Sequence, residues 1–123
     1  MNHESKCKML HGHRYAIEAT FTAKKLDKLG RVIDFGEVRQ MLGSWIDSNL
    51  DHNTILSEAD KKLGDKIASE TGQKIYYIKE NPTAENIAQH IFKEICPKIF
   101  AKKNVKCVAI KLYETPNCYT NVE

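Results

Sequence analysis

The sequence has few of the features that mark several common protein classes. Its 123 residues include only four cysteines, three prolines and one tryptophan, and the net charge of +3 is small. No apolar run approaches the roughly 20 residues needed to span a bilayer, and the N-terminus lacks a signal-peptide core. Repeats and low-complexity segments are also missing. We therefore expect one ordinary globular domain, residues 1–123, with neither a membrane nor a nucleic-acid partner.

The cysteines lack the close spacing of a disulfide framework or of a structural zinc knuckle. Cys96, Cys107 and Cys118 are each eleven residues apart, and no second Cys-x-x-Cys or His-x-x-x-His pair accompanies them. Unpaired cysteines are typical of the reducing cytosol, so we expect a cytoplasmic protein.

The most informative segment lies near the start, where His11-Gly12-His13 begins four residues after Cys7, with three residues between them. On a strand, residues two apart point to the same face, so His11 and His13 project together. Two imidazoles at this spacing suit a zinc ion with an open position, and a thiol lies close by. This combination indicates a catalytic site.

Three other interpretations of this segment remain open. The histidines can form a surface or structural pair, and Cys7 can be a small buried hydrophobic residue. Alternatively, Cys7, His11 and His13, with or without His3, can form a structural zinc site.

Hydrophobic periodicity and turn residues predict an α+β domain with antiparallel strands and helices packed on one face. Asp34 is a good N-cap for the first helix, and Glu37 completes a capping-box pattern. Thr83 is the expected N-cap of the next main helix, which approaches its end at Pro97. The predicted strands are 14–21, 74–78, 105–114 and 118–123, and the predicted helices are 34–49, 58–69 and 83–97. In 105–114, alternation places Val108, Ile110 and Leu112 on one face.

Two further acid–base candidates follow from these elements. Asp51-His52 comes directly after the first long helix, and an aspartate beside a histidine can fix its tautomer and raise its basicity. Glu114 ends an apolar strand face, where a partly buried carboxylate needs a partner such as the donor edge of a ligand. A surface Asp-His pair and a solvated strand-end glutamate are the simpler alternatives.

Taken together, these motifs resemble the 6-pyruvoyltetrahydropterin synthase superfamily, and more closely its 6-carboxytetrahydropterin synthase branch. They occur in the family's order over nearly the whole chain. The three-residue gap between the cysteine and the first histidine is the pattern of that branch. The motifs are Cys7-x-x-x-His11-Gly12-His13, Val32-Ile33-Asp34-Phe35, Leu50-Asp51-His52, Pro82-Thr83-Ala84-Glu85-Asn86 and Glu114-Thr115-Pro116.

The resemblance implies a zinc-dependent carbon–carbon lyase that acts on 7,8-dihydroneopterin triphosphate in the biosynthesis of queuosine. It implies zinc ligation by His11 and His13, with Cys7 as general base. The same resemblance gives His52, oriented by Asp51, a proton-relay role. Pterin binding is implied for Glu114, with Thr83 and Glu85 as further contacts.

The implied fold is the tunnelling fold, or T-fold, assembled as a hexamer of two stacked trimers. Residues 58–78 resemble an insertion that some members carry. The family's first strand and third zinc-binding histidine have no counterpart before Cys7, so we expect that the chain begins too late. A 6-pyruvoyltetrahydropterin synthase, an inactive pterin- or metal-binding paralogue and a structural zinc module remain alternatives.

Overall fold

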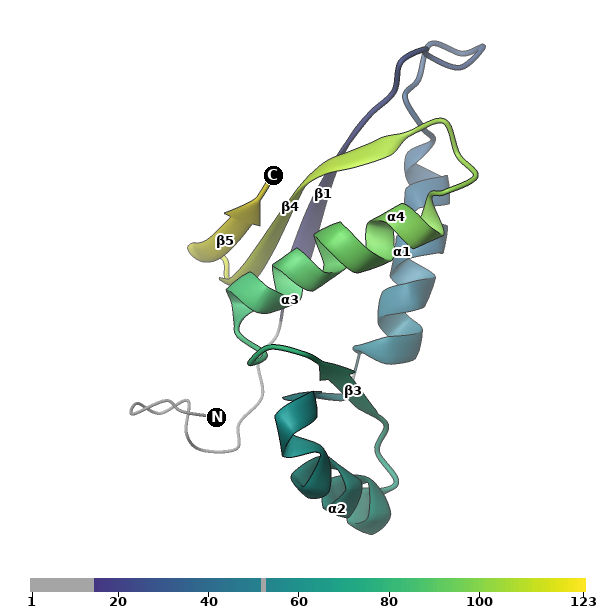
Figure 1. The fold of residues 1–123 in the computed structure, drawn as a ribbon. Coiled ribbons are helices and arrows are strands. Elements are labelled where there is room, and N and C mark those ends of the chain that lie inside the picture. Colours follow the sequence, from purple (N-terminus) through teal and green to yellow (C-terminus); the bar gives the residue numbers. More distant parts are fainter. Residues whose placement is uncertain (1–14, 52) are drawn as a thin grey trace.

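The computed structural model describes residues 15–51 and 53–123, drawn in colour in Figure 1. Its elements are a mixture of strands and helices, in agreement with the predicted α+β class. In chain order they are β1 (Ala16–Thr22), α1 (Phe35–Asn49), β2 (Thr54–Ser57), η2 (Glu58–Asp60), α2 (Lys61–Thr71), β3 (Ile75–Ile78), α3 (Ala84–His90), η3 (Ile91–Ile95), α4 (Cys96–Ile99), β4 (Lys106–Thr115) and β5 (Cys118–Val122).

The main sheet is antiparallel and has the order β1-β4-β5. In β4, Ile110 and Leu112 are buried as predicted, whereas Val108 is only half-buried and Cys107 takes the inward place instead. The reason is a register shift opposite Thr20 and Phe21, where β1 pairs first with Ala109 and then with Cys107. Such an irregularity reverses which face the following side chains occupy, so the predicted alternation is wrong at Val108.

A second, smaller sheet pairs β2 with β3 in parallel, with Thr54 opposite Ile75. The sequence predicted β3 but neither β2 nor their pairing. Between these strands, α2 provides the connection, and it ends at Gly72, whose φ of 71° places it in the left-handed region that favours glycine. Figure 1 shows that α2 lies at the end of the molecule remote from the β1–α1 loop.

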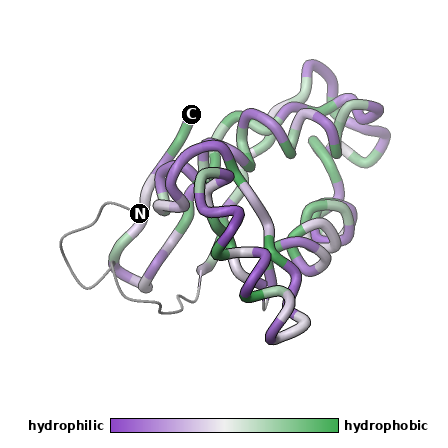
Figure 2. The backbone as a smooth tube through the Cα atoms, turned by 60° about the horizontal axis from the view of Figure 1, so that its bottom comes forward, coloured by the Kyte–Doolittle hydropathy of each residue, from purple (hydrophilic) through white to green (hydrophobic). Residues whose placement is uncertain are grey.

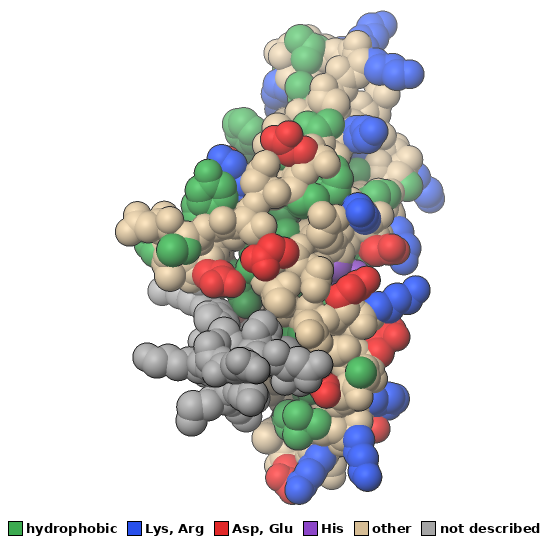
Figure 3. Space-filling model, turned by 60° about the vertical axis from the view of Figure 1, so that its left-hand side comes forward, with side chains coloured by type: hydrophobic (Ala, Val, Ile, Leu, Met, Phe, Trp, Pro, Cys, Tyr) green, Lys and Arg blue, Asp and Glu red, His purple; other side chains and the backbone are tan. Residues whose placement is uncertain are grey.

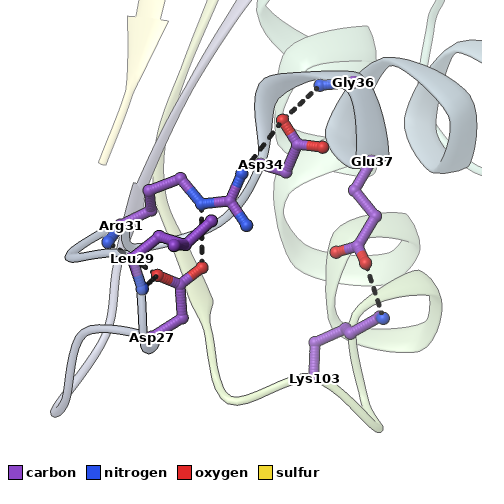
Figure 4. Close-up of polar contacts among 7 residues, drawn as sticks. All are labelled: Asp27, Leu29, Arg31, Asp34, Gly36, Glu37 and Lys103. Atoms are coloured by element: carbon purple, nitrogen blue, oxygen red, sulfur yellow. Dashed lines mark hydrogen bonds and ion pairs between the residues drawn. The ribbon is translucent and has the colours of Figure 1, made fainter.

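The N-terminus of α1 is fixed by polar contacts that reach beyond the helix (Figure 4). Asp34 is the N-cap and accepts a hydrogen bond from the Gly36 amide. Glu37 does not complete the expected capping box, because its carboxylate forms an ion pair with Lys103, with a Nζ–Oε1 distance of 3.1 Å. The capping-box prediction is therefore wrong in its second half, since a distant lysine is the partner of Glu37.

The loop before α1 is closed by Asp27. Its carboxylate accepts hydrogen bonds from the amides of Leu29 and Arg31 and from the guanidinium of Arg31. These bonds, led by the Arg31 amide, lower the pKa of Asp27. Gly30 makes the turn possible with a φ of 79°.

The second main helix begins as predicted, with Thr83 accepting a hydrogen bond from the Asn86 amide. It continues as a π-helix in η3 and ends with α4, which contains Pro97 in its first turn. Its buried side chains pack against β4 and β5. In Figure 2, short apolar and polar stretches alternate along the helical coils of the chain, as expected for helices with one buried face.

The core lies between the main sheet and the helices. It includes the fully buried side chains Ile91, Ile110, Leu112 and Cys96. The thiols of Cys96 and Cys107 interact with each other, and this interaction raises the pKa of Cys96 and lowers that of Cys107. Of the cysteines that the structure describes, all three are free thiols.

Candidate functional site

Four of the predicted site residues lie in the described part of the chain, each at the end of an element. Asp51 follows α1, Thr83 and Glu85 begin α3, and Glu114 lies near the end of β4. In Figure 1 the start of α3 and the end of β4 lie close together, whereas the end of α1 lies apart from them, toward β3. The described residues do not include the predicted site residues Cys7, His11, His13 and His52, nor His3.

The turn that carries Asp51 is closely hydrogen-bonded. Its amide donates to the Ile46 carbonyl at 2.9 Å, which continues the hydrogen bonding of α1 beyond its last residue. The Asn53 amide donates to Leu50 at 3.1 Å, and the Asn53 side chain donates to the Asn49 carbonyl at 3.1 Å. The position of Asp51 therefore depends on how the last turn of α1 is fixed.

A lysine that sequence reasoning missed also contacts this turn. Lys74 Nζ donates to the Ser48 carbonyl and to Asn49 Oδ1, both at 3.1 Å. A helix C-terminus carries partial negative charge, yet the last turn of α1 has no basic residue of its own. No local pattern marks Lys74 for this role, because it lies 26 residues from Ser48.

Thr83 and Glu85 are placed by the start of α3. The Thr83 hydroxyl oxygen accepts the Asn86 amide at 3.1 Å, and its own O–H remains a donor for a ligand. Asn86 in turn donates through its side chain to the Asn81 carbonyl at 3.0 Å. Glu85 is exposed in the first turn, where a carboxylate also stabilises the helix N-terminus. Thr83 and Glu85 thus have structural roles as well as the predicted one.

Glu114 is exposed in the described chain, so the expectation of a partly buried carboxylate is wrong. Its place near the end of β4, just before the turn to β5, leaves it open to solvent. At the preceding residue of β4, the Tyr113 ring lies 5.0 Å from the ring of Tyr119, and the ammonium of Lys111 lies 5.0 Å from the Tyr119 ring centroid. An exposed carboxylate such as that of Glu114 can accept hydrogen bonds from a donor-rich heterocycle.

Two hollows on the described surface contain none of these four residues. One, of about 440 Å³, lies between β3 and the α3–η3 helix and is lined by His90, Gln89 and Tyr77, among others. The other, of about 310 Å³, lies beside the β1–α1 loop. Neither hollow therefore brings together the predicted site residues Asp51, Thr83, Glu85 and Glu114.

The first hollow adjoins a pair of hydrogen-bonded side chains, Tyr76 and His90, with 2.6 Å between Oη and Nε2. Burial lowers the pKa of His90, opposed by the nearby carboxylates of Glu94 and Glu80. Burial also raises the pKa of Tyr76. Both side chains are therefore neutral near pH 7.

The described surface offers no extended region of one charge sign on the face in Figure 3, where acidic and basic side chains are interspersed. In residues 15–51 and 53–123, no helix combines the length and apolar character needed to cross a membrane. Within the same residues, no three His, Cys, Asp or Glu side chains are grouped to hold a metal ion. The predicted zinc ligands His11 and His13 lie outside this part, so their predicted role is not tested here.

Comparison with known proteins gives a consistent family relationship. The model of the 6-pyruvoyl tetrahydropterin synthase family matches residues 1–123. A Rickettsia bellii protein named 6-carboxy-5,6,7,8-tetrahydropterin synthase is 52% identical over 122 residues, which cover 99% of this chain and 88% of the relative. A Pyrococcus horikoshii protein, named putative 6-carboxy-5,6,7,8-tetrahydropterin synthase, is 30% identical over 99% of this chain and 79% of its own.

A solved structure supports the fold. The crystal structure of an uncharacterized protein from Wolinella succinogenes matches with a TM-score of 0.74 over 94% of this chain and 79% of that chain. At 20% sequence identity, this similarity concerns the fold alone.

Proposed function

This chain belongs to the 6-pyruvoyl tetrahydropterin synthase family, and we propose that it is a lyase of the 6-carboxytetrahydropterin synthase branch. It would convert 7,8-dihydroneopterin triphosphate and water to 6-carboxy-5,6,7,8-tetrahydropterin, acetaldehyde and triphosphate. The observation that carries the proposal is the 52% identity over 99% of the chain to relatives of that name. The three-residue gap between Cys7 and His11 agrees with this branch.

Within this proposal, the protein side chains bind the substrate and move protons. Glu114 accepts hydrogen bonds from the amino and ring N–H groups of the pterin, and the Thr83 hydroxyl and Glu85 supply further contacts. Cys7, as a thiolate, removes a proton from the substrate side chain. His52, oriented by Asp51, relays a second proton.

His11 and His13 would hold a zinc ion, because two imidazoles two residues apart in the sequence supply nitrogen donors that zinc prefers. When bound, zinc would supply Lewis-acid polarisation of the side-chain oxygens. The thiolate form of Cys7 is favoured by any cation beside it.

We also propose a hexameric assembly in the cytoplasm, with queuosine as the end of the pathway. An assembly would explain why Asp51, Glu85 and Glu114 are exposed in one chain and line neither of its two hollows. Sheet edges favour pairing between chains, and a closed barrel removes such edges. The free thiols at Cys96, Cys107 and Cys118 agree with a reducing compartment.

The test is the product formed from 7,8-dihydroneopterin triphosphate by zinc-supplemented protein, identified by mass spectrometry. Equimolar 6-carboxytetrahydropterin and acetaldehyde are expected. A 6-pyruvoyl product would favour the pyruvoyl alternative, which retains the side-chain carbons. Binding of the pterin without any turnover would favour the inactive paralogue.

A further inference from the structure

The contact between Lys74 and the end of α1 has a consequence for the site. We propose that Lys74 is a positioning residue: by capping the C-terminus of α1, it fixes the turn from which Asp51 acts in catalysis. This inference rests on the proposed function, because Asp51 is a site residue only within it.

The ammonium of Lys74 supplies the positive charge that the last turn of α1 lacks. The last carbonyls of a helix have no intrahelical donor, and they carry the negative end of the helix dipole. With no basic residue in its own last turn, α1 takes the ammonium of Lys74. The two 3.1 Å bonds, to Ser48 O and Asn49 Oδ1, satisfy a carbonyl and place a positive charge there.

Asn49 transmits this contact to the turn. Its side-chain Nδ2 donates to the Trp45 carbonyl at 2.9 Å, while its Oδ1 accepts from Lys74. Its backbone carbonyl accepts from the side chain of Asn53. Asn49 and Asn53, which flank Asp51 in the sequence, are thus hydrogen-bonded to each other, and Lys74 is one of two hydrogen-bond partners of the Asn49 side chain.

The backbone of Lys74 is itself fixed to the other end of the turn. Its carbonyl accepts the Thr54 amide at 3.3 Å, and the Thr54 hydroxyl donates to Gln73. Thr54 is the first residue of β2, and it pairs with Ile75 at the start of β3. The short turn from Asn49 to Thr54 is therefore held at both ends by the segment that contains Lys74.

This arrangement gives the predicted insertion at 58–78 a role. It supplies β3, which pairs with β2, and Lys74, which lies just before β3 and contacts the end of α1. Because the Lys74 side chain is exposed, its bonds contribute little to global stability. Its main effect is on the last turn of α1, and small displacements of a catalytic group can lower the rate strongly.

The experiment compares Lys74→Met, which keeps the aliphatic stem without the charge, with Lys74→Arg, which keeps the charge. Lys66→Met is the matched control, since it removes the same charge from an exposed position on α2. For each variant, kcat and KM with 7,8-dihydroneopterin triphosphate, the Tm, and amide hydrogen exchange of the peptide covering 45–54 are measured.

For Lys74→Met we expect kcat to fall by about tenfold or more while KM stays within about twofold. Exchange in 45–54 should become about tenfold faster, with Tm shifted by less than about 2 °C. Lys74→Arg should restore kcat to within about threefold of wild type, because a cation again reaches the helix end. Lys66→Met should match wild type in every measurement.

Unchanged kcat and unchanged exchange in Lys74→Met would overturn the inference. So would a fall in kcat that Lys74→Arg does not restore and that follows the loss of Tm, because Lys74 would then act only through stability. If wild-type protein shows no turnover, the proposed function fails, and the exchange measurement still decides whether Lys74 fixes the turn.

Discussion

The hydrogen bond between Tyr76 and His90 allows a prediction about stability and pH. Tyr76→Phe removes only the hydroxyl and retains the ring, which packs edge-on against Trp45 at 5.4 Å and against His90 at 5.5 Å. Its loss leaves Nε2 of a partly buried imidazole without its partner, at 2.6 Å in the native protein. We expect a loss of about 1 kcal/mol in the free energy of unfolding at pH 8, or roughly 4 °C in Tm.

The cost should depend on pH. Because the pKa of His90 is lowered in the folded protein by burial, the unfolded chain binds its proton first as pH falls. The stability that this group contributes is therefore complete above the unfolded pKa of about 6.5 and is lost as pH falls through the folded pKa. If neutral His90 accepts from the Tyr76 hydroxyl, protonation of Nε2 removes that acceptor. The difference between Tyr76→Phe and wild type should then shrink from pH 8 toward pH 5.

Urea denaturation at fixed protein concentration measures this difference, followed by the fluorescence of Trp45, the single tryptophan. Tyr119→Phe is the matched control, because it makes the same chemical change on a ring that is 55% exposed. An equal cost at pH 8 and pH 5 would refute the reasoning, since Nε2 would then be the donor. A cost no larger than that of Tyr119→Phe would show that the pair does not contribute to stability.

Three further predictions concern the site and the insertion. Cys7→Ala should abolish turnover while zinc stoichiometry is retained in metal analysis, and a stoichiometric loss of metal would instead make Cys7 a ligand. Glu114→Gln should weaken pterin binding by about 2–3 kcal/mol, because an acceptor oxygen becomes a donor facing the pterin N–H groups; calorimetry showing affinity within twofold of wild type would remove Glu114 from the site. Gly64→Ala would place its Cβ against the hydroxyl of Tyr77 and 2.8 Å from its Cζ. Because overpacking of about 2 kcal/mol exceeds the gain of about 1 kcal/mol in helix propensity, we expect thermal denaturation to show a net loss, and a stabilised variant would contradict this.

Local chemistry made much of the fold predictable. Asp34 and Thr83 cap the main helices as expected, because an N-cap needs only a side-chain oxygen within reach of amides two or three residues later. Periodicity likewise located α1, α2, β3 and β5. The family could be identified from the order and spacing of five short motifs, without any knowledge of how they meet in space.

Contacts between distant segments were decided only by the tertiary structure. Residues 14 or more positions apart are joined by the parallel pairing of β2 with β3 and by the bond between Tyr76 and His90. The register shift at Ala109 depends on pairing with the partner strand β1. Glu37 is a further example: its spacing predicted a local partner at the start of α1, but its carboxylate instead binds Lys103, 66 positions away.

In the candidate site, too, some features follow from local sequence and others from contacts between distant segments. The sequence by itself determined which residue types are available to it and in what order, since Asp51, Thr83, Glu85 and Glu114 each belong to a local motif. The tertiary structure decided that Glu114 is exposed and that Lys74 contacts the last turn of α1. The physical reason is that exposure and long-range hydrogen bonds depend on the packing of whole elements, which hydrophobic periods of two or 3.6 residues do not encode.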